Sequence, residues 1–243
     1  MLAIVRFLIL LIYFILMNSV LLLIFISRPF HRNSVALGGQ WYGSMAKIMG
    51  LKVIVQDPHH VDPKQTYVCI ANHQNSFDLI TICKAAFNGV VTVGKKSLIW
   101  IPFFGLIYYF SGNIMIDRKN SGKARDTLKF TAKKILDGNF SVWFFPEGTR
   151  SYGKGLLPFK TGAFRIAEQT GKPLLMICAS DTQHQIKWNR WNNGTVLVRF
   201  YEPEPLNLSM DIKGNTEYFH QKMETRLAKL TDEAEQLNRH IQA

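Results

Sequence analysis

Cysteine is scarce in this chain of 243 residues, which contains only Cys69, Cys83 and Cys178, each within an apolar run. No two of them have the Cys-x-x-Cys spacing of redox or zinc sites, and their odd number argues against a disulfide framework. We therefore expect three small buried side chains in a protein of a reducing compartment.

Several well-known motifs are also missing. The chain has no Gly-x-Ser-x-Gly, so the usual setting of a serine-hydrolase nucleophile is absent, and it has no GxGxxG. The stretch around Ser121–Ala124 lacks the earlier glycine and the final hydroxyl of a phosphate-binding P-loop. Two histidines and two aspartates between positions 57 and 62 are interrupted by proline in a predicted loop, so neither a metal nor a cofactor is expected.

Acidic residues are few, with 17 Asp and Glu against 29 Lys and Arg, which gives a formal net charge of +12. Such a balance suits anionic membranes, nucleic acid or phosphorylated ligands, and does not choose among them. With 47% hydrophobic residues, the chain can bury a sizeable core. Its length suits one domain plus a membrane anchor.

The longest apolar run is Phe7–Ser27, whose 21 residues include no charged side chain. As a helix it would be about 31 Å long, close to the hydrocarbon thickness of a bilayer. The run is too long for a signal-peptide core, and Ser27–Phe30 does not resemble a cleavage site. We predict an anchor that spans the membrane or lies in its interface. The basic cluster that follows, at positions 28–32, places the remaining chain on the cytoplasmic side.

A second uncharged run, Leu98–Phe110, is too short to span a bilayer, and Pro102 and Gly105 would interrupt a regular helix. It is preceded by two lysines and contains one tryptophan and two tyrosines, which favour the headgroup region. We predict an element that dips into one leaflet, with an ordinary buried core segment as the alternative.

The rest of the chain alternates short apolar runs with amphipathic ones. Strands are predicted at Lys52–Gln56, Tyr67–Ala71, Val90–Val93, Ile114–Ile116, Ser141–Phe145, Leu174–Ala179 and Val196–Phe200. Helical periodicity predicts a helix from Ala124 to Leu136 that ends at Gly138, and a long C-terminal helix after Asn215. This alternation indicates an α/β fold with a mixed or mostly parallel sheet flanked by helices.

The first candidate for chemistry is Asn72-His73-Gln74-Asn75-Ser76-Phe77-Asp78, directly after the predicted strand Tyr67–Ala71. Histidine can act as a general base near neutral pH, and a carboxylate on its other ring nitrogen fixes the tautomer. Residues five positions apart point about 140° away from each other on a helix, so His73 and Asp78 can touch only in a turn. We predict a turn from the strand into a helix over Leu79–Phe87. An ordinary turn histidine and capping aspartate are the alternative.

The strand Ile114–Ile116 runs into Asp117 and Arg118. An arginine at a strand end can hold a phosphate with two parallel hydrogen bonds. The alternative is a surface pair of these two residues without function.

A stronger signal follows the apolar strand Ser141–Phe145, which stops at Pro146. The next residues are Glu147, Gly148, Thr149 and Arg150. Gly148 allows a sharp turn that brings the acid and the arginine to the strand end, where open α/β sheets bind ligands. This loop suits a polar headgroup, although a solvated turn is the simpler alternative.

With these segments in order, the chain resembles the 1-acylglycerol-3-phosphate (lysophosphatidate) acyltransferases. The resemblance runs from about Leu51 to Ala179, with the N-terminal anchor also in place. It rests on NHQNSFD, VGKKSLIWIPFFG, GNIMIDR and FFPEGTRS followed by GLLPFKTGAF. The chain departs from the family at Lys172–Met176, which keeps only the first proline of a frequent Val-Pro-x-x-Pro pattern.

The resemblance implies an N-terminal membrane-anchoring segment at 1–50 and an acyltransferase domain at 51–243. It implies His73 as the base for the sn-2 hydroxyl of lysophosphatidate and Asp78 as its partner, with direct attack on a thioester and no acyl-enzyme. The acceptor and its phosphate would be bound by Lys95, Arg118, Glu147, Gly148, Thr149 and Arg150.

The implied partners are lysophosphatidate, an acyl-CoA or acyl-carrier-protein donor, and an anionic membrane surface, but not nucleic acid. The implied location is the cytoplasmic face of a bacterial inner membrane. Two alternatives stay open. One is a relative that acylates a lyso-aminolipid or another lysophospholipid, and the other is a membrane-tethered binding protein for nucleic acid or lipid that uses only its charge.

Overall fold

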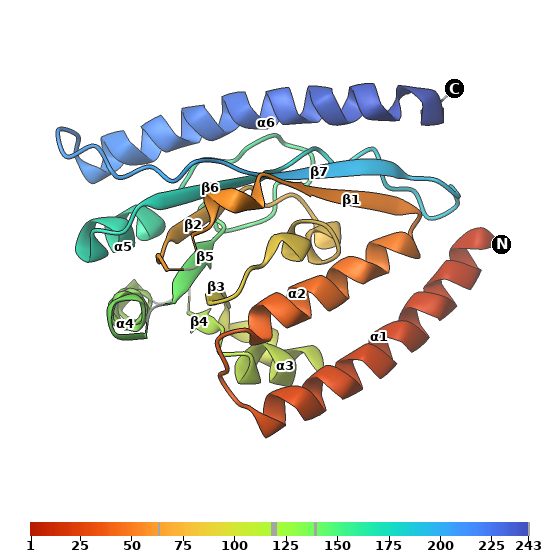
Figure 1. The fold of residues 1–243 in the computed structure, drawn as a ribbon, viewed down its shortest axis with the longest axis horizontal. Coiled ribbons are helices and arrows are strands. Elements are labelled where there is room, and N and C mark those ends of the chain that lie inside the picture. The colour runs from red at the N-terminus through yellow and green to blue at the C-terminus, as the bar shows by residue number, and fades with distance from the viewer. Residues whose placement is uncertain (63, 118–120, 139, 243) are drawn as a thin grey trace.

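The computed structural model describes residues 1–62, 64–117, 121–138 and 140–242, which form one mixed β-sheet flanked by helices (Figure 1). The strands are β1 (Leu51–Gln56), β2 (Val68–Ala71), β3 (Val90–Lys95), β4 (Ile114–Ile116), β5 (Ser141–Phe144), β6 (Leu174–Ala179) and β7 (Gly194–Phe200). Their order across the sheet is β1-β7-β6-β2-β5-β3-β4. The strands from β6 to β4 run parallel, whereas β7 is antiparallel to β6 and parallel to β1. The predicted mixed α/β fold is confirmed.

The helices are α1 (Leu2–Ser27), α2 (Ser34–Ser44), α3 (Phe104–Phe110), α4 (Ser121–Gly138), α5 (Gly162–Thr170) and α6 (Ile212–Gln242). In Figure 1, α6 lies along one side of the sheet over β6 and β7, while α1, α2 and α3 gather on the other side. The predicted helix that ends at Gly138 and the predicted long C-terminal helix are therefore both present.

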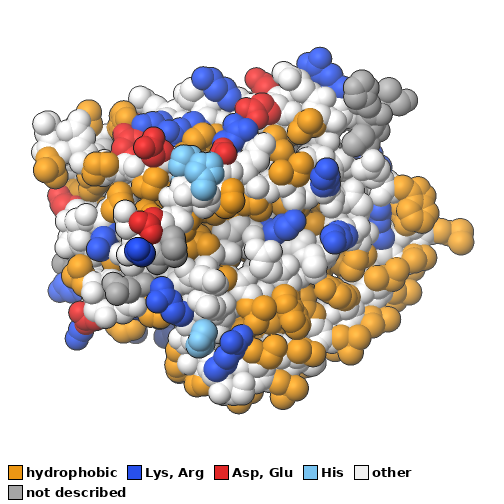
Figure 2. All heavy atoms as spheres, in the orientation of Figure 1, with side chains coloured by type: hydrophobic (Ala, Val, Ile, Leu, Met, Phe, Trp, Pro, Cys, Tyr) orange, Lys and Arg blue, Asp and Glu red, His pale blue; other side chains and the backbone are white. Residues whose placement is uncertain are grey.

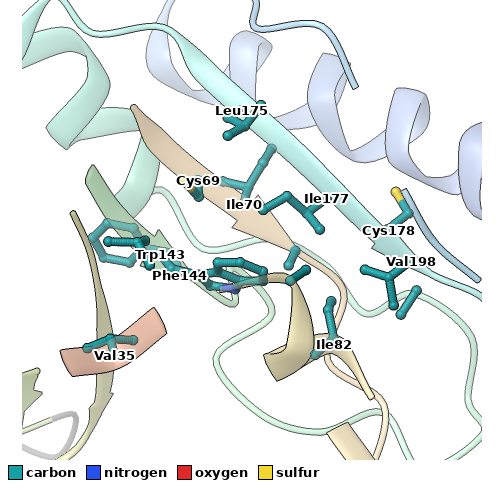
Figure 3. Close-up of a cluster of buried hydrophobic side chains, with 14 of the residues drawn as sticks. Val35, Cys69, Ile70, Ile82, Trp143, Phe144, Leu175, Ile177, Cys178 and Val198 are labelled. Carbon is teal, nitrogen blue, oxygen red and sulfur yellow. The ribbon is translucent and has the colours of Figure 1, made fainter. Parts of the chain in front are cut away.

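The central strands are apolar because both faces of the sheet are covered. Every residue of β2, β5 and β6 is buried, which explains why their sequences show continuous hydrophobic runs rather than alternation. Figure 3 shows side chains of these neighbouring strands in the resulting core. Cys69 and Cys178 are buried there, and Cys83 is half-buried by surface area. Burial raises the pKa of all three thiols.

Helix α1 lies along the folded body (Figure 1) and is attached to it at several levels. Arg6 near its start is buried, the Asn18 side chain accepts a 2.6 Å hydrogen bond from the Tyr42 hydroxyl of α2, and Phe30 just beyond its end donates from its backbone N–H to the Phe110 carbonyl. Among the described residues it is the one helix long and apolar enough to cross a membrane.

The predicted helix over Leu79–Phe87 is wrong. The segment instead forms two short 3₁₀ turns, Ser76–Leu79 and Ile82–Ala85. Tertiary packing decides this, because α2 lies against the second turn so closely that a Cβ on Gly39 would be 2.3 Å from the Cys83 carbonyl oxygen. A full α-helix would need room that α2 occupies.

The run Leu98–Phe110 divides as its proline and glycine suggest, into a 3₁₀ turn at Lys96–Trp100 and helix α3. Trp100 is 83% exposed, and Phe103, Leu106 and Tyr109 are exposed as well. This exposure does not fit an ordinary core segment. The remaining short 3₁₀ turns are Met45–Lys47 and Pro58–His60.

Candidate active site

The turn after β2 brings His73 and Asp78 into contact. The Nδ1 atom of His73 lies 2.6 Å from Oδ2 of Asp78, and the same oxygen accepts a 2.7 Å hydrogen bond from the backbone N–H of Gln74. Asp78 is buried, whereas the His73 side chain is 20% exposed. An ionised carboxylate only accepts hydrogen bonds, so in the neutral ring the proton lies on Nδ1, and Nε2 is free to take a proton from a ligand.

The His73 side chain and backbone are both fixed to the segment that follows β5. The His73 ring stacks on Phe145 at the end of β5, with ring centroids 4.1 Å apart and planes inclined by 20°. Its backbone carbonyl accepts a 2.9 Å hydrogen bond from the Ser151 N–H, and the Gln74 carbonyl accepts one of the same length from the Tyr152 N–H. The loops after β2 and β5 therefore form one unit, because these strands are neighbours in the sheet.

Two buried amides fasten the turn to the end of β6. Asn72 donates from its side chain to the Ala179 carbonyl at 3.0 Å and accepts from the Ala179 N–H at 2.9 Å. The Gln74 side chain donates to the carbonyls of Ala179 and Ser180 and accepts from the Thr182 N–H. A buried side-chain amide whose oxygen and nitrogen are both hydrogen-bonded holds the backbone firmly. Breaking these bonds would leave buried polar groups with no hydrogen-bond partner, not even water. The sequence did not predict these contacts of Asn72 and Gln74 with the end of β6.

Glu147 has a different position from the one expected for a headgroup ligand. It is buried, its Oε1 accepts a 2.6 Å hydrogen bond from the His73 N–H, and its Oε2 accepts one of 3.0 Å from the Leu157 N–H. Burial raises the pKa of Glu147 to about 7, against the effect of these two donors and helped by the nearby charge of Asp78. Glu147 thus ties the His73 backbone to the loop that precedes Lys160, and its carboxylate faces the protein.

The predicted cations fall into different places. Arg150 is exposed, and its guanidinium donates at 3.3 Å to the hydroxyls of Ser76 and Tyr152, which places it beside the His73 turn. Thr149 is exposed next to it, and Gly148 turns with φ +72°. Lys95 lies exposed at the end of β3, one strand beyond β5. Arg118 lies outside the described residues.

Lys160 is a further cation that sequence reasoning did not assign to the site. It is exposed, and its Nζ would lie 2.9 Å from a Cβ built on Gly148. Its backbone N–H donates to the Pro146 carbonyl at 2.8 Å. Lys160 lies within GLLPFKTGAF, one of the segments on which the family resemblance rests. The sequence alone did not indicate that this segment returns to the Gly148 turn.

An apolar cavity of about 100 Å³ begins beside the His73–Phe145 stack. Its walls come from the turn after β2, from the sheet and from all three helices on that side; they include Phe25, Gly38, Tyr42, Leu79, Cys83, Phe104, Ile107, Trp143 and Phe145. Such a lining suits a hydrocarbon chain. The described residues contain no cluster of three or more His, Cys, Asp or Glu that could hold a metal ion.

A histidine–carboxylate pair at the strand ends of an α/β sheet is an arrangement that enzymes use for general-base chemistry. Residues 52–180 match the model of the Acyltransferase family, and the chain belongs to that family.

Similar proteins share this assignment. A protein of Haemophilus influenzae named 1-acyl-sn-glycerol-3-phosphate acyltransferase is 41% identical over 209 residues, covering 83% of this chain and 85% of its own. A protein of the same name from Escherichia coli is 44% identical over 175 residues, covering 72% of this chain and 71% of its own. The crystal structure of the 1-acyl-sn-glycerophosphate acyltransferase of Thermotoga maritima aligns with a TM-score of 0.72 at 23% identity, over 94% of this chain and 97% of the other, and supports the fold.

Proposed function

We propose that this enzyme is a 1-acyl-sn-glycerol-3-phosphate O-acyltransferase, which makes phosphatidate from lysophosphatidate and an acyl thioester. The observation that carries the proposal is the His73–Asp78 pair, whose histidine stacks on Phe145 in the wall of an apolar cavity, in a chain whose similar relatives bear that name.

The geometry supports direct acyl transfer. Nε2 of His73 accepts the proton of the sn-2 hydroxyl as its oxygen attacks the thioester carbonyl, and Asp78 stabilises the resulting imidazolium. The new C–O bond forms as the C–S bond breaks, and the proton passes from His73 to the departing thiolate. No side chain becomes acylated. The cavity beside Phe145 accepts a hydrocarbon chain, so it holds acyl substrate close to the base.

The phosphate is proposed to lie among the exposed cations near the Gly148 turn. Arg150 and Lys160 both lie at this turn, and Lys95 lies at the end of a nearby strand. Arg118 stays a candidate from the sequence. A phosphomonoester carries nearly two negative charges, and several cations can share it.

The membrane contact is proposed to be made by α1 with the 3₁₀ turn and helix of Lys96–Phe110. Figure 2 shows hydrophobic side chains gathered over the region of α1 in Figure 1. Because α1 contacts the folded body along its length, we propose that it lies in the interface and does not cross the bilayer. The basic residues after it favour the cytoplasmic face of the membrane.

The proposal is tested by offering lysophosphatidate in phosphatidylcholine vesicles with either acyl-CoA or acyl carrier protein as donor, and reading the product by mass. His73→Ala should abolish product formation while circular dichroism and vesicle binding stay unchanged. Full activity of this variant would rule out the mechanism. Comparison with lysophospholipids of larger headgroup and with lyso-aminolipids distinguishes the acceptor.

Replacing Arg150 by Gln tests the phosphate site. The apparent KM for lysophosphatidate should rise roughly ten-fold or more, since a charge-assisted contact is lost, while the KM for the thioester stays nearly constant. Lys229→Gln, an exposed cation on α6, is the matched control. Equal changes in both KM values would argue against a phosphate role for Arg150.

A further inference from the structure

The loop between β6 and β7 carries two exposed tryptophans that the proposed reaction does not use. Trp191 is 79% exposed and Trp188 is 39% exposed. Indole favours the boundary between water and lipid because it has an apolar body and one N–H. We call the segment 187–192 the tryptophan loop.

The tryptophan loop is fixed to the start of α1. The guanidinium of Arg6 donates to the carbonyl of Trp188 at 3.0 Å, to that of Trp191 at 2.8 Å, and to that of Arg190. The backbone N–H of Ala3 donates to the Asn189 side chain at 2.9 Å. A buried arginine bonded to several carbonyls holds a loop more firmly than neutral contacts do. The two tryptophans therefore stand beside the first turns of α1.

A second anchor makes the loop backbone rigid from within. The buried Asn193 donates to the carbonyls of Met49 at 2.7 Å and Lys187 at 2.9 Å, and accepts from the Lys187 N–H at 2.8 Å. These bonds join the two ends of the loop to each other, so the backbone that carries the two indoles has a fixed conformation. This rigidity lowers the entropy that would be lost on contact with another surface.

Charge and neighbouring side chains indicate what that surface is. Lys187 is exposed and Arg190 is half-exposed, and no acidic residue occurs between Thr182 and Asn193. The adjacent turns of α1 expose Ile4, Val5, Phe7 and Leu8. Cations and indoles next to an exposed apolar helix face match a bilayer with anionic headgroups. The cations would contact the headgroups, the indoles the boundary between water and lipid, and the apolar side chains the hydrocarbon.

We propose that the tryptophan loop is a second membrane-contact site, which binds anionic phospholipid at the N-terminal end of α1. The connection that leads from β6 into the tryptophan loop includes Thr182, whose backbone N–H is bonded to Gln74 next to His73, so the loop is linked to the active-site edge of the sheet. The proposal deepens the proposed function, since that function places the acceptor in a membrane. An acidic carrier protein is the competing partner, but it gives no reason for the indoles to continue the apolar face of α1.

The first experiment measures binding of the full-length protein to vesicles of phosphatidylcholine with and without phosphatidylglycerol, in the absence of substrates. Trp188→Ser/Trp191→Ser should weaken binding to both kinds of vesicle about ten-fold, since two indoles lose their lipid contact. Lys187→Gln/Arg190→Gln should lose up to about five-fold per charge, only when phosphatidylglycerol is present and only at low salt. Leu208→Ser, which removes an exposed apolar side chain elsewhere, is the control.

The second experiment locates the indole directly. Vesicles made with brominated phospholipid should quench part of the tryptophan fluorescence, and Trp191→Phe should remove part of that quenched signal. Unchanged vesicle binding of both double variants would overturn the proposal. So would normal vesicle binding combined with loss of activity only with an acyl-carrier-protein donor, which would assign the loop to a carrier protein. Because binding is read without catalysis, failure of the proposed reaction leaves this test intact.

Discussion

At the scale of single residues, the proposed reaction depends on one histidine, His73, and on the different surroundings of its two ring nitrogens. Asp78 fixes the proton on Nδ1 of His73, and the Gln74 N–H shares the same carboxylate oxygen. The other carboxylate oxygen of Asp78 is buried and has no hydrogen-bond partner among the described residues. The carboxylate is therefore held through Oδ2, the oxygen that contacts both the imidazole and the Gln74 N–H.

Asp78→Asn tests this arrangement. The amide oxygen can still accept from Nδ1 and from the Gln74 N–H, but it carries no charge to stabilise the imidazolium. Turning the NH₂ towards Nδ1 instead would oppose the Gln74 N–H and place the proton on Nε2, which leaves no base for the hydroxyl. We expect kcat to fall about 10²–10⁴-fold with little change in the KM for either substrate. Steady-state assays in lysophosphatidate-containing vesicles measure both constants. A change confined to KM would show that Asp78 serves binding instead.

The raised pKa of Glu147 gives a second prediction at this scale. Its native pKa of about 7 lies above the ordinary value of 4.5, so between these values the folded state binds more protons than the unfolded state. The free energy of unfolding therefore falls as pH rises through this window, by up to about 1.4 kcal/mol per pH unit from this group. Glu147→Gln should remove that part of the slope.

Chemical denaturation from pH 5 to pH 8 measures the effect of Glu147. Glu168→Gln, which changes an exposed carboxylate on α5, is the control and should keep the wild-type slope. Identical slopes for wild type and Glu147→Gln would contradict the raised pKa, whatever constant offset the substitution adds.

At the scale of elements, the strands could be predicted from sequence and the contacts between their ends could not. The apolar runs of β2, β5 and β6 are local signals, because a strand buried on both faces must be hydrophobic throughout. Local spacing allowed contact of His73 with Asp78 only in a turn, and it was the resemblance to a family that implied their pairing. By contrast, Asn72 and Ala179 are 107 positions apart, and nothing in either neighbourhood encodes their pairing.

The segment after Asp78 shows how packing overrides local preference. Its composition allows a helix, but the close approach of Gly39 in α2 leaves room only for 3₁₀ turns. Glu147 is a second example, within the site, of a residue whose position depends on tertiary packing. The polar loop suggested a ligand contact, whereas the fold turned its carboxylate inwards onto the His73 and Leu157 amides.

Because side-chain amides fasten the turn to β6, removing one of them should lower both the stability of the protein and the rate of its reaction. Gln74→Met keeps the volume but leaves the Ala179 and Ser180 carbonyls and the Thr182 N–H without the glutamine. We expect unfolding free energy to fall by about 2 kcal/mol or more, and kcat to fall because the histidine backbone shifts. Thermal unfolding and vesicle assays measure these, with Gln221→Met on α6 as control. Lost stability with wild-type kcat would show that the contact is structural only.

At the scale of the whole molecule, the N-terminal helices and the sheet are parts of one core. Met17, Leu21 and Phe25 of α1 belong to the same cluster of buried side chains as the strands. The apolar cavity likewise takes its walls from α1, α2 and α3 as well as from the sheet. Residues 1–50 therefore contribute to the same core as the sheet, and the domain boundary expected at residue 50 stays a prediction.

Cutting the chain at that boundary is the test at this scale. Residues 51–243 alone would expose the surface that α1 and α2 cover and would open the cavity beside Phe145. We expect this fragment to lose the cooperative thermal transition of the full chain in the same detergent, and to remain inactive even with acceptor presented in micelles, where membrane attachment is not needed. Retention of a cooperative transition and of activity in micelles would establish residues 1–50 as a separable anchor, and the cavity would then have to be complete without them.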